Sequence, residues 1–126
     1  MKHYDDMTPD ERNAWALEHV LGWTRVEPAL AVVLWTAPDG HSYVWPDDDP
    51  AELPRPATDL NDAWMVVQQC HEWEAQGRMV GRHFRLAWYM EHPEYAPNAV
   101  AAATLICRIA WYGLLAEQSL GLGAQP

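Results

Sequence analysis

The chain has 126 residues, about half of them hydrophobic, which suits one domain with a sizeable core. Its net charge of −10 argues against nonspecific binding to DNA, RNA or an anionic membrane, and favours partners with basic surfaces. No hydrophobic run follows a basic N-terminal segment, and the apolar stretch 99–115 contains Arg108. We therefore expect neither a signal peptide nor a membrane span, and we place the protein in the cytoplasm.

The negative charge is concentrated in the first half of the chain. Residues 1–62 hold thirteen acidic and four basic residues, whereas residues 63–126 hold five acidic and four basic ones. Three of the latter basic residues, Arg78, Arg82 and Arg85, fall close together. An acidic surface in the first half and a basic cluster in the second are therefore separate candidate sites.

Residues 8–22 predict the first helix. Thr8 precedes Pro9 and lies three residues before Glu11, which is the pattern of a capping box with proline at the first helical position. Apolar residues that include Leu17 follow at helical spacing, and Gly22 suits the left-handed residue that ends a helix.

Two strands are predicted next, over 30–36 and 41–45, with Pro38, Asp39 and Gly40 as the turn between them. Residues 23–26 are considered as a short additional edge strand. The segment 46–58 is rich in proline and holds three consecutive aspartates, so it is predicted to be an exposed loop without a metal site.

Residues 59–76 predict a second helix that Thr58 or Asp59 caps and Gly77 ends. The helical spacing of its apolar residues places Leu60 and Trp64 on the face toward the core, with Leu17 of the first helix and Ile106 of the last.

The segment 82–90 alternates in polarity, with Phe84, Leu86, Trp88 and Met90 on one face, which predicts a strand. A last helix is predicted over 101–117, followed by a frayed tail.

This order of elements favours a single α+β domain over residues 1–126. The predicted architecture is an α-β-α sandwich, in which a short and mainly antiparallel sheet carries three helices on its two faces.

Three segments resemble the phage ABA-sandwich domain family. They are the helix ending in Leu21-Gly22-Trp23, the entry into the second helix at Thr58-Asp59-Leu60-Asn61-Asp62-Ala63-Trp64, and Leu105-Ile106-Cys107-Arg108 in the last helix. The resemblance covers most of the chain in the same order. It implies an α-β-α sandwich and a phage or prophage origin, and it implies no catalytic motif.

The residues offer little for catalysis or cofactor chemistry. The chain has no GxSxG motif, glycine-rich phosphate loop or HExxH motif, so we expect no catalytic residues, no metal and no cofactor. Cys70 and Cys107 lie in helical patterns without metal-ligand spacing, which favours buried, inert thiols. The sequence therefore favours a binding protein over an enzyme.

Two binding surfaces are candidates. An acidic surface favours a protein partner with a basic surface. The phage origin that the resemblance implies makes a host defence protein the expected partner, which fits an anti-CRISPR-like inhibitor that directly binds no DNA or RNA. The residues assigned to it are Asp39, Trp45, Asp47, Asp48 and Asp49.

The second candidate surface would hold a small nucleotide, because arginine pairs with phosphate and aromatic rings stack on bases. Its residues are Arg78, Arg82, Arg85, Trp88 and Tyr89. The alternative interpretation is that these arginines only neutralise neighbouring acidic residues.

A homo-oligomeric assembly protein is a third hypothesis, supported by the many Trp and Tyr residues and by a helix face of Ala99, Ala102 and Ala103.

Overall fold

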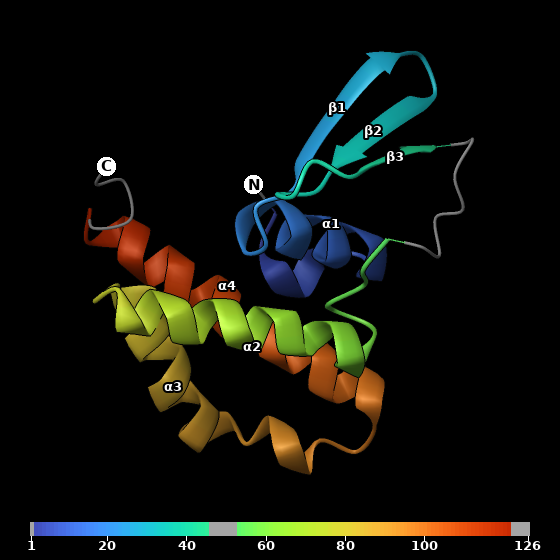
Figure 1. The fold of residues 1–126 in the computed structure, drawn as a ribbon. Helices are drawn as coiled ribbons and strands as arrows, with labels where there is room; N and C mark the ends of the chain where they lie inside the picture. Colours follow the sequence, from blue (N-terminus) through green and yellow to red (C-terminus); the bar gives the residue numbers. More distant parts are fainter. Residues whose placement is uncertain (1, 46–52, 122–126) are drawn as a thin grey trace.

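The computed structural model describes residues 2–45 and 53–121 of the chain. Within that part, the fold is mixed α+β, with one three-stranded antiparallel sheet and four α-helices (Figure 1). The elements in chain order are η1 (Tyr4–Asp6), α1 (Pro9–His19), β1 (Thr24–Ala29), β2 (Val32–Thr36), β3 (Ser42–Trp45), α2 (Leu60–Ala75), α3 (Met79–Glu91), η3 (Pro93–Tyr95) and α4 (Ala99–Ser119).

The sheet has the strand order β1-β2-β3 and packs on α1. Val26 of β1, Leu34 of β2 and Val44 of β3 pair directly across the three strands. On the other face of the sheet, Trp35 packs with Trp23 and with Leu17 of α1 in a small apolar cluster. This cluster attaches the sheet to the helical part of the molecule.

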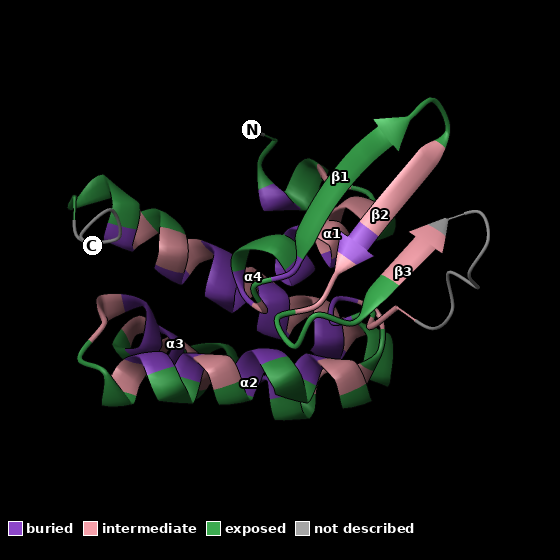
Figure 2. Cartoon of the chain, turned by 45° about the horizontal axis from the view of Figure 1, so that its top comes forward, coloured by how far each residue is buried: buried purple, intermediate pink, exposed green. Residues whose placement is uncertain are grey.

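The larger core lies between the helices. Helices α2, α3 and α4 pack on one another, and each carries buried as well as exposed positions (Figure 2). Val66, Phe84 and Ile106 are among the residues buried in this core. Tyr4 and Trp15 join this core from the N-terminal segment and α1. Buried Asn13 of α1 accepts a hydrogen bond from the backbone N–H of Ala57 at 2.7 Å, which links α1 to the turn before α2.

The helix boundaries confirm the predicted caps. The Thr8 side chain accepts a hydrogen bond from the backbone N–H of Glu11, and the Glu11 side chain accepts one from the backbone N–H of Thr8. Asp59 is the N-cap of α2, and Gly22 and Gly77 both have a positive φ. The strands predicted over 30–36 and 41–45 form as Val32–Thr36 and Ser42–Trp45, with residues 30 and 31 in a turn, and the edge strand predicted over 23–26 spans Thr24–Ala29.

The sandwich prediction is not matched. The described residues form four α-helices instead of three, and α2, α3 and α4 form a bundle of their own beside the layer made by α1 and the sheet (Figure 1). Val26 and Leu34, on the face of the sheet away from α1, belong to neither apolar cluster. The sheet is therefore an appendage of α1 and not the central layer of the domain.

The predicted strand over 82–90 is wrong, because this segment belongs to helix α3. The buried residues of α3 are Val80, Gly81 and Phe84, which follow the spacing of a helix, whereas Leu86 and Met90 are exposed. Arginine, leucine, alanine and methionine favour helices, and the segment has no β-branched residue after Val80. The alternation with period two was coincidental, and packing on α2 and α4 selected the helix.

The prediction that Trp64 lies in the core is also wrong, since 48% of the residue is exposed. The buried face of α2 consists of Ala63, Val66, Val67, Cys70 and Trp73. Leu17 and Ile106 are buried as predicted, and Leu60 is partly buried against the core. Trp64 lies at the edge of this buried stripe, between the side of α2 that faces the core and the side that faces solvent.

Candidate binding site

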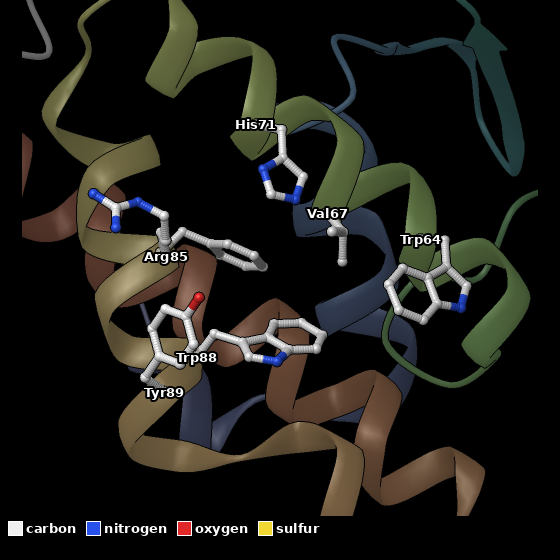
Figure 3. Close-up of a pocket in the computed structure, with 7 residues that line it drawn as sticks. Trp64, Val67, His71, Arg85, Trp88 and Tyr89 are labelled. Atoms are coloured by element: carbon white, nitrogen blue, oxygen red, sulfur yellow. The ribbon is translucent and has the colours of Figure 1, made fainter.

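Helices α2 and α3 form a hairpin whose side chains enclose an apolar hollow. We call it the aromatic hollow; its volume is about 270 Å³ (Figure 3). The rings of Trp64 on α2 and Trp88 on α3 lie 6.1 Å apart between centroids, and Trp88 also contacts buried Phe84. The full lining is Trp64, Val67, His71, Phe84, Arg85, Trp88 and Tyr89.

A second apolar hollow lies on the other side of the tryptophan pair. This end hollow, of about 320 Å³, is enclosed where α2 begins, α3 ends and α4 begins. Its lining is Leu60, Trp64, Trp88, Pro93, Glu94, Ala96, Asn98, Ala99, Ala102 and Ile106. Trp64 and Trp88 are therefore the wall that separates two neighbouring hollows.

A third hollow, the arginine hollow, has a volume of about 570 Å³ and lies at the other end of α3. It is lined by Glu74, Gly77, Arg78, Met79, Arg82, Arg85 and Glu117. Arg85 lines both this hollow and the aromatic one, and its guanidinium points away from the tryptophan rings in Figure 3.

Ion pairs hold two of the three arginines. Nη2 of Arg78 lies 2.5 Å from a carboxylate oxygen of buried Glu117, and the guanidinium also stacks over the Trp73 ring at 4.4 Å. Nε of Arg85 lies 2.5 Å from Glu74, which raises the pKa of this arginine further. The interpretation that these arginines neutralise neighbouring acidic residues thus holds for Arg78 and Arg85.

The five residues proposed for nucleotide binding come from one helix and the residue before it. The structure brings Arg85, Trp88 and Tyr89 together around the aromatic hollow, and Arg78 and Arg82 around the arginine hollow. They are therefore neighbours, but they surround two linked depressions and not one pocket.

The structure describes only part of the proposed acidic surface. Asp39 is exposed in the turn between β2 and β3, where its carboxylate accepts the backbone N–H of His41 at 2.9 Å. Asp47, Asp48 and Asp49, and the side chain of Trp45, lie outside the described part of the chain. The acidic surface stays a prediction.

The cysteines are buried as predicted. Desolvation raises the pKa of Cys70 to about 12 and raises that of Cys107 further, so both thiols are held in the unreactive protonated form. Among residues 2–45 and 53–121, no group of three or more His, Cys, Asp and Glu side chains could hold a metal ion.

Helix α4 is long and apolar enough to cross a membrane, judged by length and composition alone, and 44% of its apolar window is buried in the structure. Its inner face packs on α2 and α3, and Ala102 and Ala103 are buried there. The alanine face assigned to self-association therefore packs within the domain, with Ala99 as its exposed member.

Comparison with models of known protein families, with curated proteins and with solved structures finds no match to the chain. The resemblance to the phage ABA-sandwich family stays a prediction.

Sequence reasoning missed Trp64 and Glu74 as parts of the site. The helical spacing of Leu60, Ala63, Trp64 and Val67 predicts one buried face that includes Trp64. The stripe of Ala63, Val66, Cys70 and Trp73 runs beside it and carries the signal that Trp64 lies at the margin. The pairing of Glu74 with Arg85 has no local sequence signal, because it depends on how α3 folds back on α2.

Proposed function

We propose that this protein is a non-enzymatic binding protein that acts by stoichiometric contact with another protein, through the end hollow and its aromatic rim of Trp64 and Trp88. The observation that carries the proposal is the half-exposed Trp64, which stands between two apolar hollows. Tryptophan and tyrosine in well-packed depressions are the residues that most often dominate protein–protein affinity.

The elements around the end hollow expose further apolar side chains. Tyr95 of η3 is 80% exposed, and Val100, in the first turn of α4, is exposed as well. Glu94 places an acidic group in the lining of the same hollow. A partner that buries an apolar side chain in the hollow and brings a basic group toward Glu94 would complement this surface.

The partner class follows from the charge and from the resemblance. A net charge of −10 would speed association with a partner that has a basic surface. The phage-like segments support an accessory protein that antagonises a host defence system, acting in the host cytoplasm as an inhibitor of a nucleic-acid-targeting effector. In this proposal the acidic residues of the first half steer the encounter and the aromatic rim provides the stable contact.

The test uses two matched surface variants. Trp64→Ser removes the central ring, and Leu30→Ser removes a 98% exposed leucine at the turn between β1 and β2, far from the hollow. The tagged parent protein and both variants are used to capture proteins from infected and uninfected host lysate. We expect a protein that the parent and Leu30→Ser retain and Trp64→Ser loses.

A captured protein then allows the role of charge to be measured. Replacing Asp47, Asp48 and Asp49 together with Asn should slow association and flatten its dependence on salt, with little change in dissociation. Equal capture by both serine variants would contradict the proposed surface. A dimer in light scattering that Trp64→Ser dissociates would instead assign the surface to self-association.

A further inference from the structure

One side of α3 presents three arginines and a tyrosine in a row. Arg78 directly precedes the helix, and Arg82, Arg85 and Tyr89 follow at intervals of four, three and four residues. Residues with this spacing lie on the same side of an α-helix. At a rise of 1.5 Å per residue, Arg82 and Tyr89 are about 10 Å apart along the helix axis.

The row connects two depressions of different chemistry. Tyr89 and Trp88 line the aromatic hollow, Arg78 and Arg82 line the arginine hollow, and Arg85 lines both. Aromatic walls suit a flat ring, because stacking on an aromatic side chain needs no particular hydrogen-bond pattern. A guanidinium group suits phosphate, because it can donate two parallel hydrogen bonds.

Arg82 is the arginine of the row that is available for a ligand. Arg78 is engaged by Glu117 and Arg85 by Glu74, whereas Arg82 is exposed and forms no ion pair with any residue in 2–45 or 53–121. The three arginines exceed the two acidic residues that line the same hollow. The Debye length is about 8 Å at physiological ionic strength, so acidic residues elsewhere on the surface act only weakly here.

We propose that this side of α3 binds a small nucleotide, with the base against Trp88 and Tyr89 and the phosphate on Arg82. The nucleotide is an additional ligand and does not depend on the protein partner proposed above. Arg85 lies between the two depressions, where Glu74 holds its guanidinium. The ion pair therefore limits the phosphate affinity, and opening it would strengthen binding.

The first experiment compares three probes by calorimetry: adenosine 5′-monophosphate, adenosine and inorganic phosphate. Because the site has two parts, the nucleotide should bind at least tenfold more tightly than either fragment. A parallel series with the guanine, cytosine and uracil mononucleotides should show affinities within about tenfold of one another, since stacking tolerates any base. The absence of saturable binding by all four mononucleotides would overturn the proposal.

The second experiment separates the two parts with variants whose fold is checked by thermal melting. Arg82→Ala should weaken the nucleotide about tenfold and leave adenosine unchanged, which is the loss of one charged hydrogen-bond partner. Tyr89→Ala should weaken the binding of both the nucleotide and adenosine, and Tyr89→Phe should bind both as tightly as the parent. Arg25→Ala, which removes an exposed arginine on β1, is the matched control and should have no effect.

Glu74→Gln is the most informative variant, because the proposal predicts that it raises the affinity for the nucleotide. The neutral amide should release Arg85 and tighten the nucleotide several-fold while adenosine stays unchanged. A nucleotide affinity that Arg82→Ala does not lower, or that Glu74→Gln lowers, would show that the arginines serve only to pair with their acidic neighbours.

Discussion

Glu117, in the last turn of α4, is only 2% exposed, and its carboxylate binds both Arg78 and the start of α3. One oxygen lies 2.5 Å from Nη2 of Arg78, and the other accepts the backbone N–H of Val80 at 3.0 Å. Arg78 gives α3 no side-chain cap of its own, so Glu117, which lies 37 positions after Val80, accepts this N–H instead. This contact fixes the end of α3 at which the arginine hollow lies.

Removal of Arg78 should destabilise the fold more than neutralisation of Glu117. Arg78→Ala leaves a buried carboxylate without its counter-ion, at a cost of about 3 kcal/mol. Glu117→Gln keeps the shape and the acceptor for Val80, so the loss should be about 1 kcal/mol. Urea denaturation of the two variants measures both values, and the opposite order would contradict the role of Arg78 as the counter-ion of Glu117.

The two tryptophans at the ends of α2 should differ in their contribution to stability. Trp73 is buried in the core, and Trp73→Ala should cost about 3–5 kcal/mol. Trp64 is half exposed, so Trp64→Ala should cost roughly 1 kcal/mol, in proportion to the smaller area buried. Chemical denaturation compares the variants, and equal losses would place Trp64 in the core.

Gly81 should tolerate no side chain. An added Cβ would lie 2.5 Å from the backbone oxygen of Cys70 and in contact with the backbone of Glu74, so α2 and α3 would have to separate. At Gly113 the closest neighbour would be a side-chain carbon of Val80 at 3.0 Å, so the overlap is smaller and involves a side chain first. Gly81→Ala should therefore lower the melting temperature much more than Gly113→Ala, although alanine favours the helix at both positions.

Asp5 should make the stability depend on pH in the acidic range. The hydrogen-bonded Arg108 lowers the pKa of this carboxyl below its usual value of 3.8, with Nε of Arg108 at 2.8 Å. Because the pKa of Asp5 is lower in the folded than in the unfolded protein, its ion pair stabilises the fold fully above the unfolded pKa. This stabilisation is lost as the pH falls through the folded pKa.

The matched variant for this test is Asp5→Asn. Its melting temperature should be lower than that of the parent at pH 7, and this difference in melting temperature should disappear near pH 2. A gap that stays constant between these pH values would show that the ion pair contributes nothing.

The thiols should react only after unfolding. Burial keeps Cys70 and Cys107 protonated, so a thiol reagent at pH 8 should modify neither in the native protein within minutes. In denaturant both should react at once. Rapid modification of the native protein would mean that the core between α2 and α4 opens readily.

The local sequence determined the features that depend on neighbouring residues. The capping box of Thr8 and Glu11, the N-cap at Asp59 and the positive φ of Gly22 and Gly77 all follow from side chains within a few positions of each other. The hairpin strands could be predicted for the same reason, since their turn is a local structure.

Only the tertiary structure decided the rest. The segment 82–90 satisfies both a strand and a helix pattern, and burial of Phe84 against α2 and α4 selects the helix. The same packing moves Trp64 to the rim and brings Glu74 to Arg85 and Glu117 to Arg78. Partners this distant in the chain carry no local signal, because the free energy that joins them comes from excluding water between whole helices.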